Sequence, residues 1–333
     1  RTLYAVGAGY GIIIVTLLLL SYLAGPLEWW HTLLTFDLIL IILMELLLRR
    51  RLTSSGESTA RHAQDDDGWP DLLHQANRGW LIAGLLSLAL VGGFLRFGGL
   101  SYSEFQGDES RVLLRAVEVI QGDSDALLSH KKGPAEILAP TVVYSRVARL
   151  NETMARLPFV VANLAGLFAV FLLGWRLFHP VAGWSAAMLL ALDGYFIGFG
   201  RIVQYQSIVF LTVILVVLVL YRLARHPQSL FRYLLLASLL LATGLLAHYE
   251  AALVALPALY LLYAIWRRVG LATLGRALAL PVVLGITILA SFYVPFMLDP
   301  SFEVTYAYIT VNRIGTTFPY NNLVDVFERT TLY

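Results

Sequence analysis

Long apolar runs, separated by polar connectors, constrain the fold of this chain more than any other feature. A helix needs about 20 predominantly apolar residues to cross a hydrocarbon core of about 30 Å. Hydrophobic residues make up 58% of the 333 residues and charged residues only 14%, against about 25% charged residues in soluble domains. The runs predict an all-α polytopic membrane protein with about nine spans, at residues 3–24, 30–48, 80–98, 157–175, 181–199, 207–224, 231–247, 250–266 and 279–298.

The polar segments divide the chain into an N-terminal two-helix transmembrane module at 1–48, a flexible cytoplasmic linker at 49–79 and a transmembrane core at 80–333. The linker has too few apolar residues to form a core, and its Asp65-Asp66-Asp67 triplet is typical of a solvated charge run rather than a metal site. Because the chain does not begin with Met and stops just after a polar stretch, we expect a longer protein with an incomplete core here.

Basic residues fall in alternate connectors, which the positive-inside rule assigns to the cytoplasm. They are Arg49, Arg50, Arg51 and Arg78, then Arg176, then Arg222, Arg225 and Arg232, then Arg267, Arg268 and Arg276. The opposite face receives the long polar segment 99–156 and the polar turns 201–206 and 248–250. We therefore expect an integral multi-pass protein of the plasma (inner) membrane whose active site faces the non-cytoplasmic side.

The outer loop 99–156 contains two expected juxtamembrane helices. From Glu109 to Gln121, Leu113, Val117 and Ile120 share one helical face with Leu114 beside them, which predicts an amphipathic helix lying on the membrane or on the bundle. Arg111, Arg115 and Glu118 fall on another face. A second helix is expected to run from Pro134 to about Leu150, where Pro140 would kink or divide it.

Asp108 and Glu109 open the first of these helices. Acidic residues are common at helix starts because they complement the helix dipole, so the pair alone favours that role. The alternative is a general base that removes a proton from an acceptor hydroxyl or amine. Lys131 and Lys132, before Pro134, are likewise either cations that reach lipid headgroups or groups that neutralise a phosphate.

Polar residues at the other outer turns extend this set. Arg201, beside Gln204 and Tyr205, needs a phosphate or an acidic partner, and Asp193 in the fifth span should face a polar cavity because a carboxylate is costly in lipid.

The turn His248-Tyr249-Glu250 is either wetted surface or a metal or proton-transfer site. With no Cys and no His cluster, we predict no metal site and no cofactor, although a divalent metal stays open.

These segments together resemble the GT-C glycosyltransferases of the family 39 type, which includes protein O-mannosyltransferases and bacterial aminoarabinose transferases. The resemblance covers roughly residues 80–270. It is carried by Gly107-Asp108-Glu109, His130-Lys131-Lys132-Gly133-Pro134, Trp175-Arg176-Leu177-Phe178, Gly200-Arg201-Ile202-Val203-Gln204-Tyr205 and, most specifically, Glu152-x-x-x-Arg156-Leu157-Pro158.

The resemblance implies an inverting transferase that takes a sugar from a polyprenyl-phosphate donor on the non-cytoplasmic side and passes it to a lipid, glycan or protein acceptor. It implies Asp108 as catalytic base, Glu109 as its supporting acid, and Lys131 or Lys132 near the donor phosphate. Arg201 would join them. Family members often have Lys-Pro-Pro where this chain has Lys-Lys-Gly-Pro, so the equivalent lysine stays open.

The same family often has an acid where Gln204 and Gln206 stand here, so Glu250 or Asp193 is a candidate for that role. Other expected partners are membrane lipids. A net charge of +2 gives no reason to expect nucleic acid.

Two other classes of function compete with a transferase. A transporter or flippase would line a path through the membrane with Asp37, Glu45 and Asp193, and a scaffold would use the outer loop for docking. A transferase instead predicts that the outer acids and cations, with His248, gather around one outward cavity.

Overall fold

The computed structural model describes residues 2–23, 25–54, 78–123, 125–130, 132–146 and 151–313. Within these ranges it gives no side-chain account of residues 46–54, 78, 312 and 313. Lys131 and the acidic triplet of the linker lie outside the described residues. All regular structure in the described residues is helical, as the apolar runs predict.

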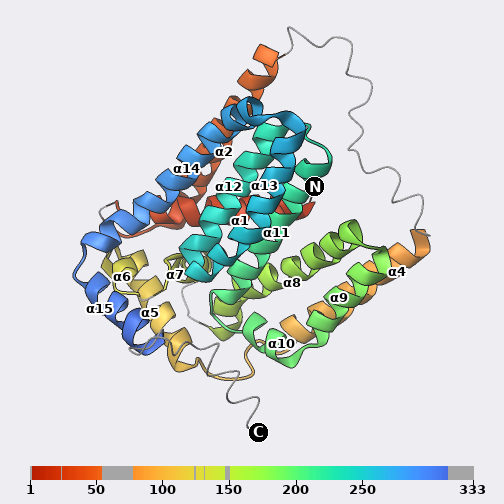
Figure 1. Ribbon diagram of the computed structural model, residues 1–333. Coiled ribbons are helices and arrows are strands. Elements are labelled where there is room, and N and C mark those ends of the chain that lie inside the picture. Colours follow the sequence, from red (N-terminus) through yellow and green to blue (C-terminus); the bar gives the residue numbers. More distant parts are fainter. Residues whose placement is uncertain are drawn as a thin grey trace.

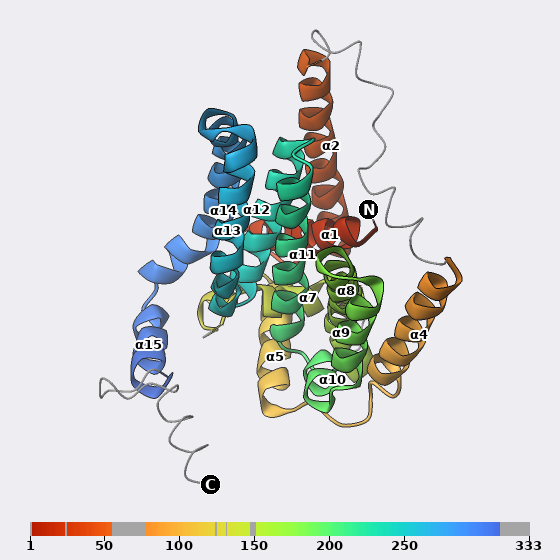
Figure 2. The ribbon, with the colours of Figure 1, turned by 45° about the vertical axis from the view of Figure 1, so that its right-hand side comes forward.

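Long helices form the body of the molecule (Figure 1). They are α1 (Thr2–Leu20), α2 (Trp29–Ser54), α4 (Arg78–Phe97), α8 (Glu152–Leu177), α9 (Pro180–Leu192), α11 (Gln206–Arg225), α12 (Leu230–Ala247), α13 (Ala255–Val269) and α14 (Leu271–Leu298). Helix α11 packs on α8, α12 and α13, while α9 joins α8 to α4. Figure 2 shows α4, α8 and α9 as a group beside the group formed by α11 to α14.

Seven helices in the described part of the chain are long and apolar enough to cross a membrane. They are α1, α4, α8, α11, α12, α14 and the continuous pair η1 (Tyr249–Val254) and α13. The predicted span 30–48 is helical in α2, which is not among the seven, so its crossing stays a prediction. The chain is thus an integral multi-pass membrane protein.

The predicted span at 181–199 is broken into two helices, which together would add an eighth crossing in the described part of the chain if they span the membrane as one unit. Helix α9 ends at Leu192, and the short α10 (Gly194–Gly200) leaves it at an angle of 72°. The break falls at Asp193, whose Oδ1 accepts the Phe196 N–H at 2.7 Å. An aspartate satisfies a free N–H at a helix start better than it fits a helix interior, and this preference divides the span.

Helix α1 packs inside the bundle, and α2 packs on α1. A side chain at Gly7 would clash with Leu215 of α11, and one at Gly11 would clash with Thr243 of α12. Small residues allow this close approach of helices in a membrane protein. Helix α1 therefore shares the core of the later helices.

The loop helices are α5 (Gly107–Gln121), α6 (Asp125–Leu128) and α7 (Ala135–Tyr144). Nearly every residue of α7 is buried, because α7 packs against α1, α5, α8 and α12. Pro140 lies within α7 without dividing it. The amphipathic α5 is confirmed, but its buried face differs from the predicted one: Leu114 is 62% exposed, and the buried residues are Glu109, Val112, Leu113, Ala116 and Val119.

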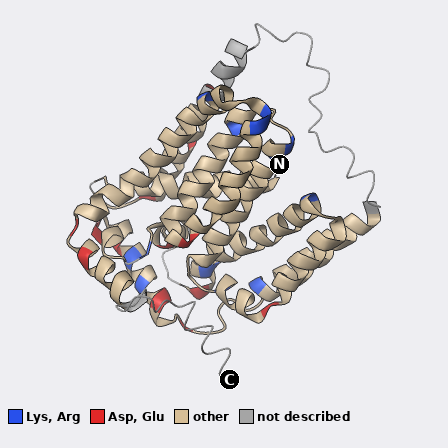
Figure 3. Cartoon of the chain, viewed as in Figure 1, with Lys and Arg blue, Asp and Glu red and all other residues tan. Residues whose placement is uncertain are grey.

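Charge is sorted between the two ends of the bundle (Figure 3). At one end, where α11 and α13 stop, Arg268 donates to the carbonyl oxygen of Arg225 at 2.8 Å. The other end carries α5 to α7, the 201–204 turn, α15 (Ser301–Ala307) and η2 (Tyr308–Arg313), and there acids and bases are mixed.

Candidate active site at the mixed-charge end

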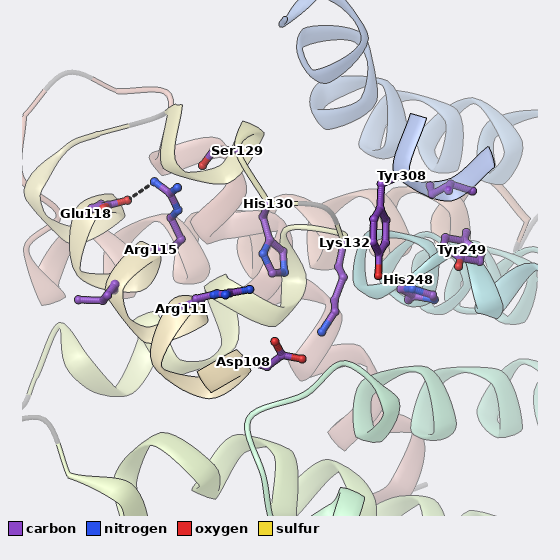
Figure 4. A pocket seen from close by; sticks show the side chains of 12 residues that line it. Asp108, Arg111, Arg115, Glu118, Ser129, His130, Lys132, His248, Tyr249 and Tyr308 are labelled. Atoms are coloured by element: carbon purple, nitrogen blue, oxygen red, sulfur yellow. Dashed lines mark hydrogen bonds and ion pairs between the residues drawn. The ribbon is translucent and has the colours of Figure 1, made fainter. Parts of the chain in front are cut away.

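A cavity of about 510 Å³ lies where α5, the connector from α6 to α7, the end of α12 and η2 meet (Figure 4). Its lining brings together acids, bases and aromatic rings from segments that are far apart in the sequence. The lining residues are Asp108, Arg111, Leu114, Arg115, Glu118, Ser129, His130, Lys132, His248, Tyr249, Tyr308 and Ile309. Convergent titratable groups in such a cavity make it the first candidate for a functional site.

Asp108 is the second residue of α5, and its exposed side chain lines the cavity. The free N–H before the helix, that of Gln106, is bound by Glu109, whose Oε2 accepts it at 3.1 Å. Glu109 therefore does the capping that sequence alone would give to either acid. In Figure 4 the Asp108 carboxylate points into the cavity, toward the end of the Lys132 side chain.

Glu109 is fully buried in an ion pair with Arg156 of α8, which is equally buried. Arg156 Nε donates to Glu109 Oε1 and Nη2 to Oε2, both at 2.9 Å. The Val203 N–H donates to the same Oε1 at 2.9 Å, and Arg156 also donates to backbone carbonyls of the segment 100–104. This pair joins α5, α8 and two loops at the base of the site.

Burial of the Glu109 carboxylate acts to raise its pKa, but hydrogen bonds from Arg156, Val203 and Gln106 outweigh burial and hold the pKa below its usual value. Such a carboxylate stays ionised at neutral pH. A low pKa and fully used oxygens make Glu109 a weak proton acceptor. Of the two adjacent acids, Asp108 is the one placed to take a proton.

A second buried carboxylate, Glu136 near the start of α7, holds the connector that carries the cations. His130 Nε2 lies 2.8 Å from Glu136 Oε2, and Lys132 Nζ lies 3.5 Å from Oε1. The Tyr205 N–H donates to Oε1 at 3.2 Å. Because charged groups are rarely buried unless they are paired, this cluster fixes where Lys132 enters the cavity.

Gly133 explains why this chain departs from a Lys-Pro-Pro pattern. Its N–H donates to the carbonyl oxygen of Ala247 at 3.2 Å, and a Cβ here would clash with the carbonyl of Leu246. Only glycine permits this approach of the connector to the end of α12. The contact brings Lys132 beside the turn that contains His248.

His248 follows α12, and its buried ring stacks on Tyr205 with centroids 3.8 Å apart and an interplanar angle of 9°. The Tyr249 ring also lies beside it, with centroids 3.9 Å apart. Tyr205 donates through Oη to Glu250 Oε1 at 3.1 Å. Burial raises the pKa of the Tyr205 phenol, and the Glu250 carboxylate adds to the shift. Lys132 Nζ lies 5.2 Å from the Tyr205 ring, within range of a cation–π contact.

Residues 142–297, just under half of the chain, match the family model described as dolichyl-phosphate-mannose-protein mannosyltransferase. The match supports glycosyltransferase activity of the GT-C type. The comparisons with curated proteins and with solved structures found no match. The matched range includes Arg156, Tyr205 and His248 but begins after Asp108 and Lys132, so the roles of those two residues rest on the site itself.

The glycosyltransferase does not bring every expected residue to the cavity. Arg201 does not line it: Nη2 donates to the carbonyls of Gly98 at 2.7 Å and Gly99 at 3.0 Å, and the guanidinium lies 4.8 Å from the Tyr102 ring. Gln204 lies in the same half-buried turn. Arg201 holds the turn at Gly98 and Gly99 in place.

Asp193 is exposed and closes the start of α10, outside the cavity lining. Glu250 lies beside the lining residues His248 and Tyr249 and contacts Tyr205, which is buried behind them. The cavity thus unites Asp108, Lys132, His248 and Tyr249 of the predicted site residues. Lys131 lies outside the described residues, and Asp37 and Glu45 line neither this cavity nor the second one described below.

Arg111 and Arg115 line the cavity, although the sequence analysis gave them only a place on the polar face of α5. Asp108, Arg111, Arg115 and Glu118 follow one another at helical spacing on that helix, which places them on one face. This stripe is the signal that identifies them. Arg115 Nη1 forms an ion pair with Glu118 Oε2 at 2.7 Å. Arg111 is the cation nearest in sequence to Asp108.

Arg96 of α4 is a further residue that the sequence analysis missed. It is fully buried and donates through Nε to Asn163 Oδ1 at 2.6 Å, through Nη1 to the Ala191 carbonyl at 3.1 Å and through Nη2 to the Leu190 carbonyl at 3.3 Å. The last carbonyls of a helix lack partners within it. Arg96 therefore satisfies the end of α9 and holds the break that leads into the 201–204 turn.

Within the described residues, no group of three or more His, Asp or Glu side chains is arranged to hold a metal ion.

Proposed function

We propose that this glycosyltransferase moves a sugar from a polyprenyl-phosphate donor to an acceptor at the non-cytoplasmic face of the plasma membrane, with inversion at the anomeric carbon. One observation carries the proposal: an exposed carboxylate, Asp108, lines the same cavity as Lys132 and Arg111. An acid and cations that share one cavity can serve opposite ends of a single transfer, because one accepts a proton while the others receive negative charge.

In the proposed reaction, a hydroxyl or amine of the acceptor attacks the anomeric carbon of the sugar while the bond from that carbon to the phosphate oxygen breaks. Asp108 takes the proton of the attacking group as general base. The electron pair of the broken bond leaves on the polyprenyl phosphate. Lys132 and Arg111 stabilise that charge. A single displacement of this kind inverts the configuration.

The other cavity residues fit supporting roles. Glu109 is a positioning residue in this proposal, since its carboxylate fixes the first turn of α5 and leaves Asp108 facing the cavity. Tyr249 and His248 line the wall opposite α5 and are placed to contact the sugar hydroxyls. Lys131 remains a second candidate for the phosphate. The acceptor stays open between lipid, glycan and protein.

Charge sorting supports the proposed sidedness. Arg225 and Arg268 lie at the end of the bundle away from the cavity, and basic connectors face the cytoplasm in most membrane proteins. The cavity then faces the opposite side. A polyprenyl tail cannot leave the bilayer, so a site at the end of the helices meets the donor phosphate at headgroup depth.

The test is transfer by purified protein carrying Asp108→Asn, with a polyprenyl-phosphate sugar and a candidate acceptor. We expect transfer to fall by about 100-fold to 10,000-fold, the usual contribution of a general base, while expression and thermal stability stay at the wild-type level. Stability is expected to hold because Glu109, and not Asp108, binds the Gln106 N–H.

Asp193→Asn is the matched control. It makes the same chemical change at another helix start, outside the cavity, and asparagine caps a helix as well as aspartate does. We expect near-normal transfer. An active Asp108→Asn protein would remove the assigned base, and an inactive Asp193→Asn protein would place the site elsewhere.

A further inference from the structure

The cavity that contains Asp108 also contains an imidazole with no part in the reaction above. His130 lies in the connector from α6 to α7 and lines this cavity with Arg111 and Lys132. A second cavity, of about 450 Å³, lies at the basic end of the bundle between α1, α4, α8 and α11. The described residues that line it include arginines but no Asp, Glu or His. Among the lining residues of the two cavities, carboxylates and imidazoles therefore occur only at the mixed-charge end.

The fully buried Glu136 holds the His130 ring. His130 Nε2 lies 2.8 Å from Glu136 Oε2, and the His130 side chain is only 13% exposed. An ionised carboxylate offers acceptors and no donor, so Nε2 is the ring nitrogen that carries a hydrogen in this contact. Such a bond fixes the tautomer and the orientation of an imidazole. The other nitrogen, Nδ1, is then the one that can act on a ligand, and in Figure 4 the ring points into the cavity between Arg111 and Lys132.

The charges around His130 come from several elements. Glu136 Oε1 accepts the Tyr205 N–H at 3.2 Å and lies 3.5 Å from Lys132 Nζ, while Oε2 faces His130. The other titratable or charged groups that line the cavity are Asp108, Arg111, Arg115 and Glu118 of α5, His248 and Tyr249 after α12, and Tyr308 of η2. A buried carboxylate stabilises positive charge on the groups beside it, so Glu136 supports a protonated imidazole among these cations.

The proposed transfer creates negative charge on the leaving group. A sugar joined to a polyprenyl chain through a phosphodiester carries one negative charge on its phosphate, and breaking the bond to the anomeric carbon leaves a phosphate monoester with two. Lys132 and Arg111 stabilise that charge without removing it. A proton delivered to the leaving oxygen removes one of the charges, and this is the contribution of a general acid.

We propose that His130 is a general acid in the transfer. As the bond from the anomeric carbon to the phosphate oxygen breaks, its electron pair goes to that oxygen, and the imidazolium gives its Nδ1 proton to the same oxygen. His130 is left neutral and regains a proton from solvent. Glu136 is the positioning residue that orients the ring. This inference rests on the proposed function, because it needs a phosphate leaving group beside Lys132 and Arg111.

The test is steady-state transfer by the purified full chain carrying His130→Gln, with a polyprenyl-phosphate sugar and an acceptor on which the wild type is active. The Gln amide still donates to Glu136 but has no proton to give. We expect kcat to fall by about 100-fold to 10,000-fold, with KM nearly unchanged. Between about pH 5 and about pH 9 the wild-type kcat should fall toward high pH, where the imidazole is neutral, and the variant should lack this fall.

His179→Gln is the matched control. It makes the same change just before α9, outside the cavity, and should leave kcat and its pH dependence at the wild-type level. His130→Phe removes the bond to Glu136 as well as the proton, so it should lower both thermal stability and kcat. If His130 only anchored the connector, His130→Gln would restore the transfer that His130→Phe loses, and the inference would be overturned.

The pH profile is valid even for a less stable variant, because the pH at which kcat falls does not depend on the amount of folded protein. A fall toward high pH that persists in His130→Gln would also overturn the inference. The Asp108→Asn variant separates the two proposals. If it stays active, the proposed function fails; if it is inactive while His130→Gln keeps the wild-type kcat and pH profile, only the role of His130 fails.

Discussion

The two cavities of this protein lie at opposite ends of one helix bundle and differ in what surrounds their cations. At the mixed-charge end, Lys132 and Arg111 line a cavity with Asp108, whereas the described residues that line the cavity at the basic end include Arg176 and Arg222 but no Asp or Glu. Transfer of a sugar needs a group that takes a proton, so the lining carboxylate is what separates the proposed catalytic cavity from the second cavity.

The side chains that fix the structure of the two ends also differ. The mixed-charge end is organised around two fully buried carboxylates, Glu109 and Glu136, and each is bound by cations and backbone N–H groups. The basic end uses tyrosines, which hold Arg222 and the end of α8. Buried carboxylates give fixed positions but depend on every partner. The catalytic end should therefore be the more sensitive of the two to loss of a single side chain.

Among substitutions that test this comparison, Arg156→Met should cause the largest loss of unfolding free energy. The substitution leaves Glu109 buried without its partner, and breaking a buried pair in this way costs about 3–5 kcal/mol. Chemical or thermal unfolding in detergent should show that loss, with reduced transfer in the protein that still folds.

Arg115→Met supplies the comparison, because it breaks the Arg115–Glu118 pair, whose side chains are 38% and 37% exposed. Exposed pairs contribute about 0–1 kcal/mol. Equal losses of stability in the two variants would contradict the assignment of Glu109 and Arg156 as the structural centre of the site.

An intermediate effect is expected for Lys132→Gln, which removes a cation from the catalytic cavity. A hydrogen bond to a charged group contributes about 1.5–3 kcal/mol, so transfer should fall by about 10-fold to 100-fold.

Arg176→Gln should leave transfer within about twofold of wild type, because Arg176 lines the second cavity and not the one with Asp108. Lys132→Arg should recover part of the transfer lost in Lys132→Gln, since the positive charge is restored. If Arg176→Gln lowered transfer as much as Lys132→Gln does, the two cavities would not be functionally distinct.

The smallest effect concerns pH. The pKa of Glu109 is lowered on folding, so the stabilisation it provides is complete above the unfolded pKa of about 4.3 and is lost as pH falls through the lower folded pKa. The difference in melting temperature between wild type and Glu109→Gln should stay constant from about pH 7 to about pH 5 and shrink only below about pH 4. A difference that already shrinks near pH 6 would mean that the folded pKa is raised.

Hydropathy predicted the helical membrane fold because apolar length is a local property that a single chain shows directly. The amphipathic helix at α5 was predictable for the same reason, and so was the presence of Asp108 at its start. The face of α5 that is buried could not be predicted in the same way. Val112 and Ala116 are buried while Leu114 is exposed, because packing against α7 and the buried Glu109, rather than the sum of apolar side chains, sets the rotation of α5.

Other features depended on partners that lie far away in the sequence. The sequence predicted a phosphate or an acidic partner for Arg201, and within the described residues its guanidinium donates to the carbonyls of Gly98 and Gly99. Arg96 carried no local signal, since its partners are Asn163 and the end of α9, and the Tyr205 N–H that Glu136 binds is equally distant in the sequence. Buried polar residues acquire meaning only from tertiary contacts, and a single sequence does not show these.

The close contact of Gly133 with the end of α12 has a consequence for protein engineering. The connector that carries Lys132 packs against the carbonyl of Leu246 at the end of α12. Helix α5 is held to α8 by the ion pair of Glu109 with Arg156. A chimera that transplants this loop onto a related bundle should work only if the recipient supplies both docking points. Exchange of sugar specificity is therefore better attempted at Tyr249, on the opposite wall, than by swapping the loop itself.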